Sequence, residues 1–161
     1  MVVLYPECHT EKFLCEFIGY SKSKIITCNG KPNVINKLRS SDNDIIAIGI
    51  VDEVPMKTQH PDCKLYIEKA NYLVISLLQQ KNNAKYFLIE FKEEFEPWIK
   101  NINKKAKVDP ERYNSKMDRL HEYTGVNIPD KYKKFLKKIF DSYPDPINKF
   151  KQWIKDCDNN S

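Results

Sequence analysis

Hydrophobic residues in the first half of the chain alternate between short continuous runs and helical stripes. A run at residues 2–5 that ends at Pro6 predicts a buried strand close to the N-terminus. Thr10 is the expected N-cap of the helix that follows, and Gly19 is its expected stop. The helix is indicated by an apolar stripe at Phe13, Leu14, Phe17 and Ile18.

The same alternation continues to residue 51. Residues 24–28 are rich in β-forming residues and end at the turn signal Asn29-Gly30, which predicts a second strand. Pro32 suits the first turn of a second helix. Residues 44–51 form the most apolar run and predict a central strand that is buried on both faces. This strand–helix order predicts an α/β fold with a small, mostly parallel sheet flanked by helices.

The second half begins with strand signals and ends with helical ones. Residues 54–64 predict a loop, residues 73–78 a strand or a buried helix, and residues 86–91 a strand. Helical stripes follow within residues 93–105, 115–123, 132–139 and 150–157. We therefore expect an α/β domain over residues 1–105 and a helical C-terminal extension, residues 106–161, packed on it.

Composition narrows the class of protein. A chain of 161 residues can bury roughly 70% of its unfolded surface, so no disulfide or structural metal is needed for stability. No apolar run reaches membrane-spanning length, and residues 1–9 lack the features of a signal peptide. The five cysteines form no CxxC pair, which favours reduced thiols over disulfides or a zinc site. We therefore expect a soluble cytoplasmic protein with no membrane partner.

Acidic residues follow two of the predicted strands. Glu7 lies in the turn after the first strand, and Asp52 and Glu53 come directly after the central strand. Ligands of open α/β sheets bind beyond the carboxyl ends of the strands. Glu7 and Asp52 are therefore expected to lie together at one edge of the sheet.

Three segments in this order resemble motifs of TOPRIM proteins. Residues 7–14 resemble the opening motif, in which a glutamate after the first strand precedes Thr-Glu and an apolar helix. Residues 48–53 resemble the strand that leads to the Asp-x-Asp of the family. Residues 95–99 resemble the Glu-x-Trp segment of small stand-alone TOPRIM proteins related to overcoming-lysogenization-defect (OLD) nucleases. The resemblance covers about residues 1–100 and implies a TOPRIM-like fold, often in bacterial defence loci.

The resemblance implies a metal-dependent nuclease that hydrolyses phosphodiester bonds of DNA or RNA. Mg²⁺ or Mn²⁺ would be the cofactor, because such ions prefer oxygen ligands and stabilise charge on the reacting oxygens. Glu7, Asp52 and Glu53 are the candidate metal ligands. Glu11 joins them as a candidate catalytic residue.

Two departures from the motif keep other functions open. The second aspartate of the family falls at Val54, and the glycine after the first glutamate is Cys8. One alternative is therefore a catalytically degenerate TOPRIM-fold module that binds nucleic acid or a protein partner. A further alternative is another small α/β enzyme that uses the same acids, for example a phosphatase-like one.

Charge is unevenly distributed along the chain, and its distribution indicates where nucleic acid could bind. Residues 1–98 carry 12 basic and 13 acidic residues, whereas residues 99–138 carry 12 and 5. This basic segment can attract phosphate backbones, although solvated helix faces have the same composition. The candidate nucleic-acid contacts are Lys31, Lys133, Lys134, Lys137 and Lys138.

Overall fold

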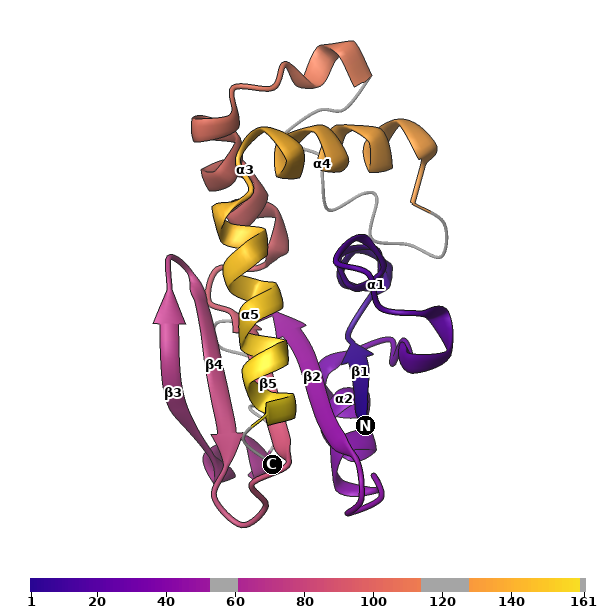
Figure 1. Cartoon of the computed structure of the whole chain (residues 1–161), viewed down its shortest axis with the longest axis vertical. Coiled ribbons are helices and arrows are strands. Elements are labelled where there is room, and N and C mark those ends of the chain that lie inside the picture. The colour runs from indigo at the N-terminus through magenta and orange to yellow at the C-terminus, as the bar shows by residue number, and fades with distance from the viewer. Residues whose placement is uncertain (53–60, 114–127, 160–161) are drawn as a thin grey trace.

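A five-stranded mixed sheet forms the centre of the computed structural model (Figure 1). The structure describes residues 1–52, 61–113 and 128–159. The strand order is β1-β2-β5-β4-β3. The strands are β1 (Val2–Pro6), β2 (Ile46–Asp52), β3 (Tyr66–Tyr72), β4 (Ile75–Gln80) and β5 (Tyr86–Phe91).

The fold is α/β as predicted, but the prediction of a mostly parallel sheet is wrong. β1, β2 and β5 pair in parallel, whereas β4 pairs antiparallel with both β5 and β3. The links explain this difference, because only residues 73–74 join β3 to β4 and only residues 81–85 join β4 to β5. Links this short close hairpins, since a parallel crossover needs a dozen or more residues.

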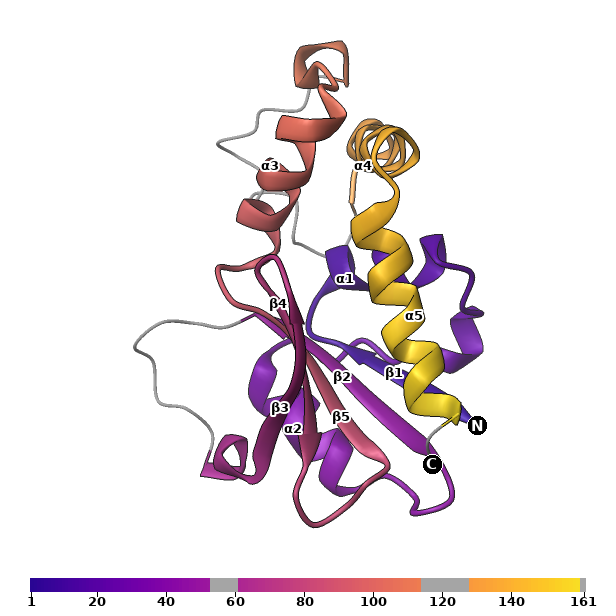
Figure 2. The same ribbon diagram turned by 60° about the vertical axis from the view of Figure 1, so that its left-hand side comes forward.

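Helices cover both faces of the sheet (Figure 2). Alternate residues of β2 divide between two hydrophobic clusters, with Ile48 and Ile50 in one and Ala47 and Val51 in the other. The cluster of Ala47 and Val51 includes helix α2 (Lys31–Arg39), which has Pro32 in its first turn as expected. The cluster on the opposite face includes α1 (His9–Phe17) and α5 (Asp145–Asn159).

The C-terminal helices join the same hydrophobic core as the sheet. α3 (Phe95–Ala106) and α4 (Asp130–Ser142) extend beyond the end of the sheet, and α5 returns along its face (Figure 1). Phe91 of β5 lies 5.1 Å from Trp98 of α3 and 6.4 Å from Phe150 of α5, measured between ring centroids. The core therefore includes residues from both sides of the expected boundary at residue 105, and the boundary itself stays a prediction.

Three local predictions have different outcomes. Residues 24–28 do not form the predicted strand, because a 3₁₀ turn at Lys22–Lys24 leaves only Ile25 bridged to Leu4. For residues 73–78, where a strand and a buried helix were both expected possibilities, the structure has a strand, β4. β3 was not predicted, because this edge strand is largely solvent-exposed and lacks a hydrophobic run. The helix predicted at residues 115–123 lies outside the described residues.

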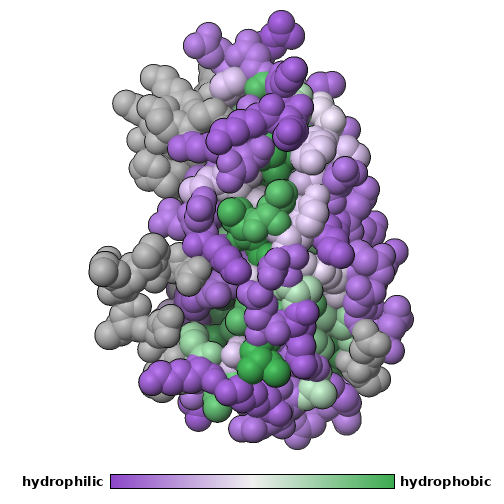
Figure 3. Space-filling model, turned by 90° about the vertical axis from the view of Figure 1, so that its left-hand side faces the viewer, coloured by the Kyte–Doolittle hydropathy of each residue, from purple (hydrophilic) through white to green (hydrophobic). Residues whose placement is uncertain are grey.

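The outer face of β3 shows hydrophobic side chains only in small, separate areas among hydrophilic ones (Figure 3). Ile67 of β3 and Leu73, in the turn that follows it, are exposed large hydrophobic residues. An edge strand that carries charged residues such as Lys69 resists pairing with other chains.

Among the helices of the described residues, none has the length and apolarity needed to cross a membrane.

We predict that Gly49→Ala destabilises the fold. A Cβ atom at Gly49 would lie 2.6 Å from Leu88 Cδ2 and 2.6 Å from Val34 Cγ1, between β5 and α2. Overpacking of this kind costs about 1–3 kcal/mol of unfolding free energy, which urea denaturation measures. Val34→Ala serves as the partner in a double-mutant cycle. Equal stability of Gly49→Ala and the parent chain would contradict the close packing of α2 on β2.

Candidate functional site

Parallel pairing of β1 and β2 brings Glu7 and Asp52 together. Pro6 pairs with Ile50, and the N–H of Glu7 continues the ladder by donating to the Ile50 carbonyl at 2.8 Å. The backbone N–H of Asp52 then donates to Oε2 of Glu7 at 3.1 Å. The predicted meeting of the two strand ends is confirmed in this geometry.

The N-terminus of α1 places Glu11 beside this edge. Cys8 is the N-cap, its Sγ accepts from the Thr10 N–H at 3.4 Å, and its own N–H donates to Oε2 of Glu11 at 3.1 Å. This capping box folds the Glu11 carboxylate back over the helix start. The prediction of Thr10 as N-cap is wrong, because the capping-box spacing begins at Cys8 and Thr10 is buried inside the helix.

Buried carboxylate oxygens without partners mark the site. Glu11 is 0% exposed, and its Oε1 has no hydrogen-bond partner among the described residues. Oδ1 of Asp52 and the hydroxyl of Thr10 are also buried and have no hydrogen-bond partner among the described residues. An unpaired buried polar group costs about 1–3 kcal/mol, so folding retains three such atoms in one region at a measurable cost. A bound cation or a hydrogen-bond donor would satisfy the two carboxylate oxygens.

The electrostatics of the three acids favour uptake of positive charge. The pKa of Asp52 is raised to about 8, chiefly by burial and then by the neighbouring carboxylates of Glu11 and Glu7. Burial also raises the pKa of Glu11 to about 7. The pKa of Glu7 is raised by burial, although the backbone N–H of Asp52 opposes the shift. Near neutral pH Asp52 and Glu11 therefore hold protons for part or most of the time, and a bound cation can replace them.

Two more acids from the start of α3 complete the acidic region. The charges of Glu96 and Glu94 also raise the pKa of Asp52. Glu96 is buried within the first turn of α3, and Glu94 precedes the helix with φ of 80°. Glu94 was not predicted, because nothing in its polar sequence context separates it from a surface residue.

Lys31 reaches the site, but its charge is already paired. Its Nζ donates to Oε1 of Glu90 at 2.6 Å and to the Asp52 carbonyl at 3.4 Å, and both side chains of the pair are mostly buried. In this structure Lys31 therefore supports the end of β2. Glu90 was missed by sequence reasoning, although a single charged residue within the apolar run of β5 was an available signal.

The remaining candidates lie elsewhere. Glu53 and Val54 are outside the described residues, so the role predicted for Glu53 stays a prediction. Lys133 is partly exposed on α4 and lies 3.7 Å from Asp130. The other predicted nucleic-acid contacts on α4 are exposed, namely Lys134, Lys137 and Lys138.

The donor set fits a hard divalent cation in chemistry. Oδ1 of Asp52 and Oε1 of Glu11 are carboxylate oxygens without partners in the part of the chain that the structure describes, and Mg²⁺ is commonly held by one or two carboxylates plus water. In the described residues, no three His, Cys, Asp or Glu side chains are already placed around one point as ligands. The chemical match to a divalent cation therefore depends on the carboxylates of Asp52 and Glu11, with Glu7 beside them.

No protein-family model matches the chain, and the searches of curated proteins and of solved structures found no match either. The candidate site is therefore defined by its own geometry.

We predict that Asp52→Asn stabilises the metal-free protein at alkaline pH. The folded-state pKa of Asp52 is raised to about 8, so its contribution to stability is present below pH 4 and is lost as the pH rises towards 8. Above pH 8 the variant should gain on the order of 2 kcal/mol in unfolding free energy, and the gain should shrink near pH 4. Urea denaturation with EDTA at several pH values measures this. Asp44→Asn, which changes an exposed residue before β2, is the matched control.

Proposed function

We propose that this protein is a metal-dependent nuclease that hydrolyses phosphodiester bonds of DNA or RNA, of the TOPRIM type. The observation that carries the proposal is the meeting of Glu7, Asp52 and Glu11 at the carboxyl edge of the parallel strands. Two of these acids have buried oxygens without partners among the described residues. Charge repulsion among buried acids is otherwise unfavourable, and a divalent cation would relieve it.

Each acid has a distinct role in this proposal. A bound Mg²⁺ or Mn²⁺ would stabilise negative charge on the attacking and leaving oxygens of the phosphodiester. Asp52 and Glu11 would hold the ion through Oδ1 and Oε1. Glu7 is held by the Asp52 N–H, and burial raises its pKa, which is the direction that favours a group relaying a proton.

The Lys31–Glu90 pair would position this edge. Its 2.6 Å contact lies beside the end of β2, and the same ammonium group donates to the Asp52 carbonyl. Lys31 therefore restrains the backbone that carries Asp52. The bacterial defence context and a cytoplasmic location belong to the same proposal and depend on the resemblance in the motifs.

One observation favours the alternative of a catalytically degenerate binding module. The Cys8 thiol and the Glu11 carboxylate cap the start of α1 themselves. Free N–H groups at a helix start attract phosphate, and here side chains satisfy part of that capacity. A binding module would retain affinity for nucleic acid or a protein partner without any cleavage.

We predict Mg²⁺- or Mn²⁺-dependent cleavage of nucleic acid that requires the three acids. Labelled single- and double-stranded DNA and RNA are incubated with the protein and each metal, and products are resolved on denaturing gels. Asp52→Asn and Glu7→Gln should each lower the rate by about 100-fold or more. Glu11→Gln should raise the metal concentration needed for half-maximal rate, because it removes one proposed ligand charge.

The control is Glu93→Gln, which makes the same charge change at an exposed residue before α3. Its rate should equal that of the parent chain. Absence of cleavage with every metal and substrate, while nucleic acid still binds, would replace the nuclease proposal with the binding module.

A further inference from the structure

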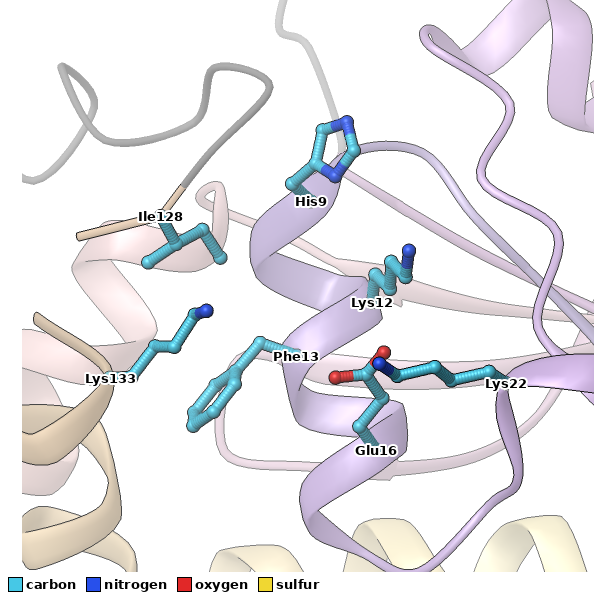
Figure 4. A pocket seen from close by; sticks show the side chains of 7 residues that line it. All are labelled: His9, Lys12, Phe13, Glu16, Lys22, Ile128 and Lys133. Atoms are coloured by element: carbon cyan, nitrogen blue, oxygen red, sulfur yellow. The ribbon is translucent and has the colours of Figure 1, made fainter. Parts of the chain in front are cut away.

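A basic pocket of about 260 Å³ lies between α1 and the start of α4, outside the acidic site (Figure 4). Its charged and aromatic lining is formed by His9, Lys12, Phe13, Glu16, Lys22 and Lys133. Lys133 enters from α4, whereas Lys12 and Lys22 lie on the other side of the Phe13 ring (Figure 4). Drug-sized ligands occupy about 300–1,000 Å³, so this pocket suits a smaller group.

Helix α1 connects the pocket to the acidic site. Its pocket residues recur at i, i+3, i+4 and i+7, so they share one face of the helix. Glu11, on another face, is buried towards Asp52. His9 is the first residue of α1 and follows Glu7 by two positions, so the pocket begins beside the proposed reaction centre.

The two walls of the pocket are fixed to each other. Phe17 at the end of α1 and Phe140 of α4 have ring centroids 5.1 Å apart. Phe13 lies 6.4 Å from Phe17 and packs against the main core while it lines the pocket. The helices that carry Lys133 and Phe13 therefore pack against each other before a ligand binds, and such preorganisation lowers the cost of binding.

The charges favour an anion with an aromatic part. Three lysines face one glutamate in the lining, and Asp130 lies 3.7 Å from Lys133, so an excess of one positive charge remains when His9 is left out of the count. Lysine acts as a point charge for phosphate, and an aromatic ring provides a stacking surface for a base. An acidic peptide would use the charges alone and would leave the Phe13 ring without a matching surface.

We propose that this pocket holds a phosphate and an adjoining base of single-stranded DNA or RNA as the strand passes along α1 to the acidic edge. The inference rests on the proposed function and names its substrate class as single-stranded nucleic acid. It also supplies the positive charge that the acidic edge lacks, since Lys31 is paired with Glu90. Lys12 and Lys22 contact the phosphate, and Phe13 stacks on the base.

The test is the affinity of a short fluorescein-labelled oligothymidine strand for the full chain, measured by fluorescence anisotropy in EDTA. Lys12→Ala with Lys22→Ala should weaken binding about tenfold or more and reduce the salt slope by about 1.4, or 0.7 for each lost contact. Phe13→Leu keeps an apolar side chain and should weaken binding about fivefold or more. Lys81→Ala with Lys105→Ala, at exposed positions outside this pocket, is the charge-matched control. Thermal unfolding confirms that each variant is folded.

Several results would overturn the pocket proposal. One is an equal loss of affinity in the pocket variants and the control pair, which would indicate general charge attraction. Another is competition by inorganic phosphate as strong as that by oligothymidine, which would indicate a site for a free anion. Binding of poly-glutamate that is as tight and is insensitive to Phe13→Leu would indicate an acidic protein partner.

The test separates this inference from the proposed hydrolysis. EDTA prevents metal-dependent cleavage, so pocket-dependent binding is measured without it. Pocket-dependent binding without cleavage in Mg²⁺ or Mn²⁺ would remove only the nuclease proposal. Cleavage by the parent chain with no effect of the pocket variants on binding would remove only the pocket.

Discussion

The site depends on the parallel register of β1 with β2. This register sets Pro6 opposite Ile50, so the residues that follow both strands emerge at one edge. The carboxylate of Glu7 then accepts a hydrogen bond from the N–H of Asp52, and the turn into α1 places Glu11 at the same edge. A shift by one residue would reverse the faces of β1, so Val2 and Leu4 would leave the cluster that they share with α1 and enter the one on the opposite face. The burial of the sheet thus fixes the position of the acids.

Stability and chemistry oppose each other at this edge. Burial of Glu7, Glu11 and Asp52 raises their pKa values, so folding favours their protonated forms. Buried oxygens that have no hydrogen-bond partner within residues 1–52, 61–113 and 128–159 add to this cost in folding free energy. Proteins retain such costs mainly at functional sites, where the same groups bind a ligand strongly. The surrounding core, which includes Phe91 and Trp98, supplies the stability that offsets them.

Most of the elements near the site follow from the sequence. The continuous apolar run of β2 and the stripe of α1 identify both elements, and the order of elements predicts that Glu7 and Asp52 meet. The antiparallel half of the sheet does not follow as readily, because β3 is an exposed edge strand and β4 is a short apolar run compatible with two structures. A short link between two strands indicates a hairpin and therefore antiparallel pairing. The length of the link can be counted only when the ends of both strands are known.

Two features, one at the acidic site and one in the basic pocket, could not be predicted from local patterns. Pairing of Lys31 with Glu90 joins residues that are 59 positions apart, and no periodicity reports such a contact. The basic pocket brings Lys133 of α4 to Lys12 of α1, which depends on how the C-terminal helices pack. Capping by Cys8 was accessible in principle, because its spacing to Glu11 is that of a capping box, although serine or threonine is the usual first residue.

The most direct test of the account is an anomalous-scattering map from crystals soaked with Mn²⁺. We predict one strong peak bonded to the Asp52 carboxylate, with Glu11 and Glu7 around it. The absence of a peak at this edge in crystals that bind Mn²⁺ elsewhere would contradict the account, as would an edge at which the side chains of Glu7 and Asp52 lie apart.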